Sequence, residues 1–393
     1  MRRTSLLLVF AAALAAGPGL AAGRMDNETL QRSFVEAMQR LESGDLERAE
    51  TILRSVLKGA STPRVKLELA RALFLRGKYR EAKALFEEVM TRTDTPWRVR
   101  DNIAHFVRQI EERVGYLKLG STLISDSNPR NLPPQKEVTI GNLQLTPTEA
   151  PRKMTGSRHT VQGWLPVNRP FRGGGYLNAS LSDYSGEDSD RLTADLGVLK
   201  ELSDDGRVRA KAGFELGMAG GRRLYQFPYL GFDSVLSQSE SSRVTAEAKV
   251  GRIDVPDAGY LDATAATAAA AWRKTLSPAA SASFRGTVEV SDANEHPYSY
   301  HGWELSPGID LFQQRSLFLI GARAAVGARS YHGKDPLFGE RRSDTRYRLE
   351  VSLGNKRWRW QDRYVSLLAS FERTDSSIGF YEYRKFNVSL VLE

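Results

Sequence analysis

The stretch Val208–Leu216, which reads VRAKAGFEL, decides the fold class of the larger part of this chain. Its even-numbered positions are Val, Ala, Ala, Phe and Leu, whereas its odd-numbered positions are Arg, Lys, Gly and Glu. Because successive side chains of a β-strand point to opposite faces, this alternation predicts a strand with one apolar and one polar face. A soluble β-sandwich and a membrane barrel both use such strands, so the neighbouring sequence has to distinguish between them.

The same alternation recurs in Val244–Val250, Ala280–Val290 and Leu349–Leu353, with no helical pattern between the segments after Arg158. Several intervening turns are short and polar, as in Ser203–Gly206, and aromatic residues gather near the strand ends. Outer-membrane barrels have these features, and closure removes every unpaired sheet edge from the lipid. We therefore predict a transmembrane antiparallel barrel of about 14 strands, one near residues 116–125 and the others between about 157 and 393, in preference to a soluble sandwich.

The first residues predict export. Arg2 and Arg3 precede the apolar run Leu6–Ala16, and Pro18 and small residues follow it. This order is typical of a secretory signal peptide, which we assign to residues 1–22. No other stretch is long and apolar enough for a membrane-spanning helix.

Between about residues 27 and 115 the apolar positions follow a helical period and repeat after 33 residues. A glycine recurs at the turn, and alanines recur where two helices would approach closely. This period is close to that of tetratricopeptide repeats. The sequence therefore predicts an α+β multidomain protein, in which a short helical repeat domain (27–115) precedes the barrel (116–393). The repeat domain is either a docking surface or a helical cap without a binding role. The repeated positions are Ala37, Leu41, Gly44, Ala49, Leu53 and Val56 against Ala70, Phe74, Gly77, Ala82, Phe86 and Val89.

The segment 126–157 is rich in Pro, Asn, Thr and Gln, which predicts a long loop or plug with a small hairpin around Val138–Leu145. The last residues, Phe386 to Glu393, alternate as a final strand should, although Glu393 stands where outer-membrane barrels generally carry an aromatic residue. We expect the assembly signal to be less typical for this reason.

Composition narrows the function classes. The chain has no cysteine, which excludes disulfides and thiol catalysis, and its five histidines show no metal-binding spacing. The net charge of +9 is spread along the chain without a nucleic-acid-binding motif. We predict no enzyme activity, no cofactor, no metal and no nucleic-acid partner.

Charged residues on the polar faces of the predicted strands are candidates to face the lumen. Because they mix both signs, we interpret them as the ordinary filling of a wet lumen rather than as a catalytic set. The candidates are Arg209, Lys211, Glu215, Glu247, Lys249, Arg285, Glu289, Glu350 and Glu372.

The chain also resembles the surface lipoprotein assembly modulators, the outer-membrane component of type eleven secretion systems. The matching stretches are Leu67–Phe74 with Gly77–Ala82, Ser125–Asn128, Arg342–Asp344, Ser376–Ile378 and Tyr381–Lys385. Members pair a periplasmic tetratricopeptide-like domain with a fourteen-stranded barrel. The resemblance singles out positions whose roles it does not assign: Asp126, Ser127, Asn128, Ser377, Ile378, Tyr381, Tyr383 and Arg384.

What the resemblance implies is an outer-membrane translocator with its N-terminal domain in the periplasm. Its partners would be a protein client (a surface lipoprotein or a secreted protein), outer-membrane lipid, and the barrel-assembly machinery during biogenesis. The alternative is a polysaccharide-export or solute-diffusion porin with a periplasmic repeat domain. A mixed-sign lumen argues mildly against a pore dedicated to an anionic polymer.

Overall fold

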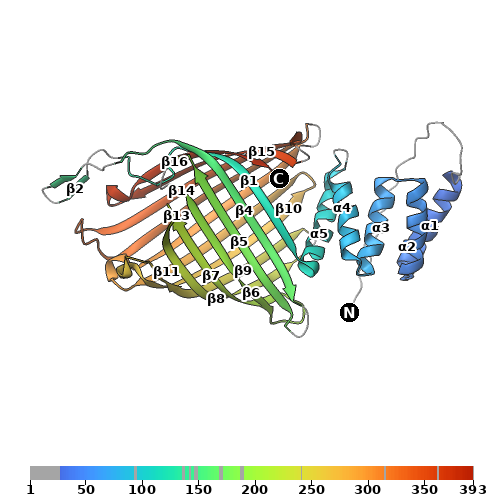
Figure 1. Cartoon of the computed structure of the whole chain (residues 1–393), viewed down its shortest axis with the longest axis horizontal. Helices are drawn as coiled ribbons and strands as arrows, with labels where there is room; N and C mark the ends of the chain where they lie inside the picture. The colour runs from blue at the N-terminus through green and yellow to red at the C-terminus, as the bar shows by residue number, and fades with distance from the viewer. Residues whose placement is uncertain are drawn as a thin grey trace. The chain divides into compact units, whose positions relative to one another are not determined.

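The computed structural model describes residues 27–92, 95–134, 138–140, 143–145, 149–167, 171–185, 190–239, 241–313, 316–360 and 363–392. The expected signal peptide therefore lies outside the described residues. The chain divides into two compact units, Met1–Val89 and Met90–Glu393, which are coloured from blue to red along the chain in Figure 1. None of the described helices has the length and apolar character needed to cross a membrane.

The first unit is built from helices α1 (Asn27–Ser43), α2 (Leu46–Gly59), α3 (Pro63–Leu75) and α4 (Tyr79–Met90). Gly44 and Gly77 end α1 and α3 with φ of +84° and +77°, a conformation that glycine adopts without steric cost. The alanines that recur after 33 residues are fully buried between the helices. They are Ala37, Ala49, Ala70 and Ala82. The 33-residue pattern thus marks two helix pairs, whereas membership of the tetratricopeptide class stays a prediction.

Glu50 joins the two helix pairs electrostatically. Its side chain is only 5% exposed and accepts hydrogen bonds from Arg54 (2.9 Å), Arg76 (2.5 Å) and Lys78 (2.8 Å). Burial raises the pKa of Glu50, but these three cations outweigh it and hold the pKa at about 2. The Glu50 carboxylate therefore stays ionised and links α2 to the turn between α3 and α4.

The second unit begins with α5 (Trp97–Val114), which leads directly into the first barrel strand. Gly115 makes the turn with φ +84°, and a Cβ there would lie 2.6 Å from the carbonyl oxygen of Trp164. The indole of Trp164 donates to the carbonyl of Glu112 (3.0 Å), and Lys118 pairs with Glu111 (2.8 Å). These contacts hold the end of α5 against the barrel wall.

Fourteen antiparallel strands close into a barrel in the order β1-β16-β15-β14-β13-β12-β11-β10-β9-β8-β7-β6-β5-β4. The strands are β1 (Tyr116–Asp126), β4 (Met154–Val167), β5 (Gly173–Tyr184), β6 (Arg191–Glu201), β7 (Val208–Ala219), β8 (Arg222–Gln238), β9 (Ser242–Ile253), β10 (Ala263–Ser277), β11 (Ala280–Ala293), β12 (Tyr300–Gln313), β13 (Phe318–Lys334), β14 (Arg341–Trp360), β15 (Arg363–Ser376) and β16 (Tyr383–Leu392). We call the end of the barrel where β1 begins, at Tyr116, the near rim, and the end at Asp126 the far rim.

The remaining elements are short. Strands β2 (Val138–Ile140) and β3 (Leu143–Leu145) form a separate hairpin inside the 126–157 segment. One-turn 3-10 helices lie in three loops of the far rim: η1 (Gly259–Leu261), η2 (His296–Tyr298) and η3 (Gly379–Tyr381).

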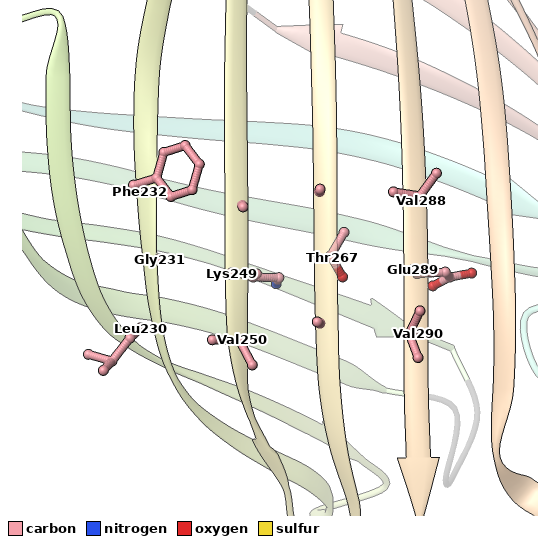
Figure 2. A pocket seen from close by; sticks show the side chains of 12 residues that line it. Leu230, Gly231, Phe232, Lys249, Val250, Thr267, Val288, Glu289 and Val290 are labelled. Atoms are coloured by element: carbon pink, nitrogen blue, oxygen red, sulfur yellow. The ribbon is translucent and has the colours of Figure 1, made fainter.

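Side chains alternate between the two faces of the barrel wall. Val250 and Val288 are exposed, at 51% and 56%, and Figure 2 shows them on strands that also carry Lys249 and Glu289. Lys249 instead pairs with Glu215 of β7 at 2.9 Å, so the contact passes over the whole of β8. Side chains converge on the concave face of a curved sheet and diverge on its convex face. The apolar set therefore faces outward and the charged set faces the lumen.

The predicted fold class is confirmed: five helices precede a closed barrel of 14 strands among the described residues. The first strand lies where the alternation placed it. The next one begins at Met154, slightly earlier than the expected residue 157, because Met154–Gly156 continue the pairing with β1 up to Asp126.

Candidate functional site

The nine candidate lumen residues share the concave face and are engaged in polar contacts there. Several contacts pass over an intervening strand, as in the pairs of Glu247 with Arg285 and of Glu289 with Arg329. The contacts are Arg209–Asp233 (3.6 Å), Lys211–Asp195 (3.6 Å), Glu215–Lys249 (2.9 Å), Glu247–Arg285, Glu289–Arg329 (2.6 Å), Glu350–Arg323 (3.0 Å) and Glu372–Arg348 (3.6 Å).

The rings of two tyrosines lie flat against one side of the lumen wall. The hydroxyls of Tyr176 on β5 and Tyr229 on β8 lie 2.7 Å apart, and Tyr229 donates to Asp195 at 2.7 Å. A Cβ on Gly213 would lie 2.3 Å from the Tyr176 hydroxyl, so the rings lie flat over glycine backbone instead of projecting into the lumen. Lys211 lies against both rings, at 4.6 and 5.2 Å from their centroids. No local sequence pattern marks this cluster, because its members are spread over β5 to β8.

A turn at Asp126–Asn128 ties the first strand to the last one at the far rim. Asn128 is 1% exposed, and its side-chain amide donates to the carbonyls of Leu132 (2.9 Å) and Arg384 (3.3 Å). The side-chain oxygen of Asn128 (Oδ1) accepts a hydrogen bond from the backbone N–H of Leu132 at 2.9 Å. Asp126 accepts from the N–H of Asn128, and the Ser127 hydroxyl accepts from the N–H of Phe386. This turn therefore links the ends of β1 and β16, next to the strand pairing that closes the barrel.

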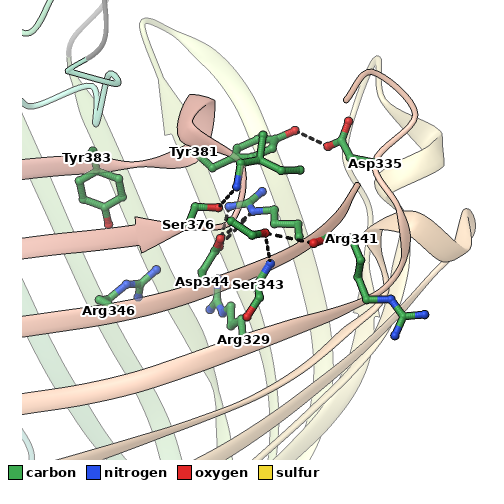
Figure 3. Close-up of polar contacts among 12 residues, drawn as sticks. Arg329, Asp335, Arg341, Ser343, Asp344, Arg346, Ser376, Tyr381 and Tyr383 are labelled. Atoms are coloured by element: carbon green, nitrogen blue, oxygen red, sulfur yellow. Dashed lines mark hydrogen bonds and ion pairs between the residues drawn. The ribbon is translucent and has the colours of Figure 1, made fainter. Parts of the chain in front are cut away.

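Ser377 and Ile378 lie in the loop between β15 and β16, and Ser377 binds this loop to the start of β14. The hydroxyl of Ser377 accepts from the N–H of Ser343 (2.9 Å) and donates to the carbonyl of Arg341 (3.0 Å), as Figure 3 shows. Ile378 is 4% exposed, and its N–H donates to Ser376. The β15–β16 loop is thus bound to the start of β14.

Tyr381 continues this connection towards the β13–β14 loop. Its hydroxyl donates to Asp335 at 2.8 Å (Figure 3), and its ring packs against the guanidinium of Arg342 at 3.6 Å. Arg342 lies 4.6 Å from the Tyr331 ring on its other side and is bound to Asp344 through two nitrogens. We call Asp335, Arg342, Asp344, Ser377 and Tyr381 the loop latch. Asp335 had no sequence signal, because it lies 46 residues from its partner.

The last two motif residues point to opposite faces of β16. Tyr383 faces the lumen and donates to Glu372 at 2.5 Å. Arg384 is exposed on the outer face and contributes its backbone carbonyl to Asn128. The motif therefore gathers at the far rim between β1 and β13–β16, apart from the candidate lumen charges of β7, β9 and β11. Within the described part of the chain, no three His, Asp or Glu side chains are arranged to hold a metal ion.

Solved structures with a similar arrangement are outer-membrane proteins of low sequence identity. OmpT of Vibrio cholerae, an outer membrane protein, is 10% identical with a TM-score of 0.36, covering 71% of this chain and 99% of that chain. The outer membrane channel DcaP of Acinetobacter baumannii is 9% identical with a TM-score of 0.40, covering 72% and 98%. OccK10 of Pseudomonas aeruginosa is 13% identical with a TM-score of 0.37, covering 71% and 98%. Similarity at this level says nothing about function.

No curated protein matches the sequence significantly. The model of one family, described as surface lipoprotein assembly modifier, matches residues 272–393, which run from the end of β10 through β16. This match includes the loop latch and the β16 side of the Asn128 junction. Together with the apolar outer face of the closed barrel, it locates the protein in the outer membrane. The resemblance to the surface lipoprotein assembly family is thus confirmed over residues 272–393.

Proposed function

We propose that this protein is an outer-membrane translocator that secretes or surface-displays a specific protein client through or along its barrel. The observation that carries the proposal is the family match, because residues 272–393 include strands β11 to β16 and five of the eight motif residues at the far rim. In the proposal, helices α1 to α4 engage the client in the periplasm, and the barrel-assembly machinery inserts the barrel into the membrane.

The lumen supports a protein client over a small ion or a charged polymer. Its charges mix both signs and are bound to one another, as in the Glu289–Arg329 and Glu215–Lys249 pairs. A wall of this kind does not build the field of one sign that selects ions or draws in an anionic polymer. It presents many separate donors and acceptors, which suit an extended polypeptide.

The test is a comparison of surface and released proteins in the native bacterium with and without the gene. We expect one or two specific proteins to leave the surface or the medium and to accumulate in the periplasm, and the intact gene to restore them. Unchanged protein profiles, with loss of a capsule-like polymer or of solute uptake, would replace the proposal by the porin alternative.

A further inference from the structure

The lumen face of β14, β15 and β16 carries a cluster of polar side chains in two neighbouring rows. Each row crosses the three strands at positions that are partners in register. Because alternate residues of a strand share a face, both rows point into the lumen. We call them the β14–β16 cluster: Arg346, Thr374 and Tyr383 nearer the far rim, then Arg348, Glu372 and Lys385.

Three cations of the cluster share the single carboxylate of Glu372. This carboxylate lies 3.9 Å from Arg346, 3.6 Å from Arg348 and 3.9 Å from Lys385, and all three distances are longer than a hydrogen bond. A second carboxylate, Glu304 on β12, lies 3.7 Å from Arg348. Three positive and two negative charges therefore leave this stretch of the lumen wall with one positive charge in excess.

Two buried polar atoms of the cluster have no hydrogen-bond partner among the residues that the structure describes. They are Nε of Arg346 and the hydroxyl oxygen of Thr374, which come from residues that are partners in register. Thr374 is 3% exposed, and the Tyr383 hydroxyl beside it donates to Glu372 instead. Buried polar groups are almost always hydrogen-bonded, so these two atoms mark a place that is prepared for a partner.

Tyr383 competes with Arg346 for the carboxylate of Glu372. Its hydroxyl donates at 2.5 Å to Oε1 of Glu372, the same oxygen that lies 3.9 Å from Nε of Arg346. The side chain of Arg346, which Figure 3 labels together with Tyr383, is 33% exposed. Its register partner on β13 is Gly327, which adds no side chain beside it. The guanidinium of Arg346 is therefore accessible from the lumen.

Charge and geometry together select a carboxylate as the occupant. A guanidinium presents parallel N–H donors that match the two oxygens of a carboxylate. One carboxylate also cancels the single excess charge, whereas a phosphate dianion would overcompensate it. The next charges around Lys385 are those of Asp126 and Arg191, which balance each other.

We propose that the β14–β16 cluster binds an aspartate or glutamate side chain of the client polypeptide as the client passes through the lumen. This inference rests on the proposed function and assigns the route to the lumen rather than to the outer face. The cluster lies within the family match over residues 272–393. The client carboxylate binds Arg346, and Arg348 and Lys385 attract it at longer range. Tyr383 is a positioning residue, because it holds Glu372 away from Arg346.

The test is peptide binding to the purified full-length protein in a neutral detergent. The probe is a fluorescein-labelled hexaglutamate peptide, and fluorescence anisotropy at low ionic strength reports binding. We expect Arg346→Gln to weaken binding about tenfold, which corresponds to about 1.4 kcal/mol. Tyr383→Phe frees Glu372 to pair with Arg346, so this variant should also weaken binding although it leaves the net charge unchanged. A hexaglutamine peptide should not bind measurably.

Arg285→Gln is the matched control. Arg285 also faces the lumen, where it pairs with Glu247, and its replacement changes the net charge by the same amount as Arg346→Gln. This variant should bind the peptide as tightly as the wild type. Heat-dependent gel mobility reports whether each variant barrel is folded, and Tyr383→Phe, which keeps every charge, carries the test if Arg346→Gln does not fold.

Three results would overturn the inference. Equal weakening by Arg346→Gln and Arg285→Gln would show that binding follows net charge alone. Equally tight binding of hexaglutamine would show that carboxylates are not recognised. Displacement of the peptide by inorganic phosphate at lower concentrations than by acetate would assign the cluster to inorganic anions. None of these measurements involves secretion, so the gene-deletion comparison decides the translocator proposal separately.

Discussion

At the scale of single residues, the buried Glu50 carboxylate stabilises the helical unit through its bonds to three cations. A buried carboxylate bound to three cations is costly to neutralise, because the cations lose their partner while remaining partly buried. We expect Glu50→Gln to lower the free energy of unfolding of the helices by roughly 3 kcal/mol at pH 7. The measurement is urea unfolding of the full-length protein followed by helical circular dichroism. Glu47→Gln is the control, since Glu47 lies in the same helix and contacts Arg76, at 3.3 Å, through a side chain that is 80% exposed.

The same residue predicts the pH dependence of this unit. The pKa of Glu50 is about 2 in the folded state, against 4.5 for an unperturbed group. Its contribution is therefore fully present above about pH 4.5 and is lost as the pH falls towards 2. The wild-type helices should lose stability over this window, whereas the difference between wild type and Glu50→Gln should shrink. A constant difference down to pH 2 would contradict this account.

The variant Tyr381→Phe tests whether the loop latch restrains the β13–β14 loop. Removing its hydroxyl with Tyr381→Phe leaves the ring against Arg342 but deletes the hydrogen bond to the carboxylate of Asp335. Bonds to charged groups contribute about 1.5–3 kcal/mol, so protease cleavage in the β13–β14 loop should become clearly faster in folded protein. Tyr347→Phe is the control, because Tyr347 is 46% exposed on the outer face. Equal cleavage rates in both variants would mean that the Tyr381–Asp335 bond does not restrain the loop.

At the scale of elements, the junction of the first and last strands depends on one buried amide. Asn128 satisfies three backbone groups, two of Leu132 and one of Arg384, which lies 256 residues away in the sequence. Asn128→Ala leaves these groups without that partner, and each lost bond to a buried group costs about 1–3 kcal/mol. We expect the variant barrel to unfold at a lower temperature, as measured by its heat-dependent gel mobility. Gln162→Ala, which removes an exposed amide on β4, should leave this temperature unchanged.

At the scale of the whole molecule, the division at Val89 and Met90 predicts that the barrel folds without the first four helices. The barrel has a complete hydrogen-bonded wall of its own, and α5 is held by Trp164 and Lys118 from within the second unit. A chain that carries a signal peptide followed by residues 90–393 should insert and show normal heat-dependent gel mobility. Under the proposed function it should fail to release the client. A truncated chain that does not insert would show that the helices are needed for assembly.

The sequence by itself determined the fold class. The two patterns that specify the class, the helical period of residues 27–115 and the two-residue alternation of the strands, are both local. Alternation in stretches such as Val208–Leu216 gives each strand one lipid-facing side, and a lipid-embedded sheet must close. The strand count followed from repetition of that pattern, and the resemblance over 272–393 followed from short motifs in a fixed order. The polar faces of the strands likewise indicated which charged side chains face the lumen.

Only the tertiary structure decided which of these residues meet. The partners of Tyr381, Asn128 and Glu289 lie 46, 256 and 40 residues away, and no local period specifies such distances. They are set by the register of fourteen strands around a closed wall, in which a shift by one residue would turn every side chain to the other face.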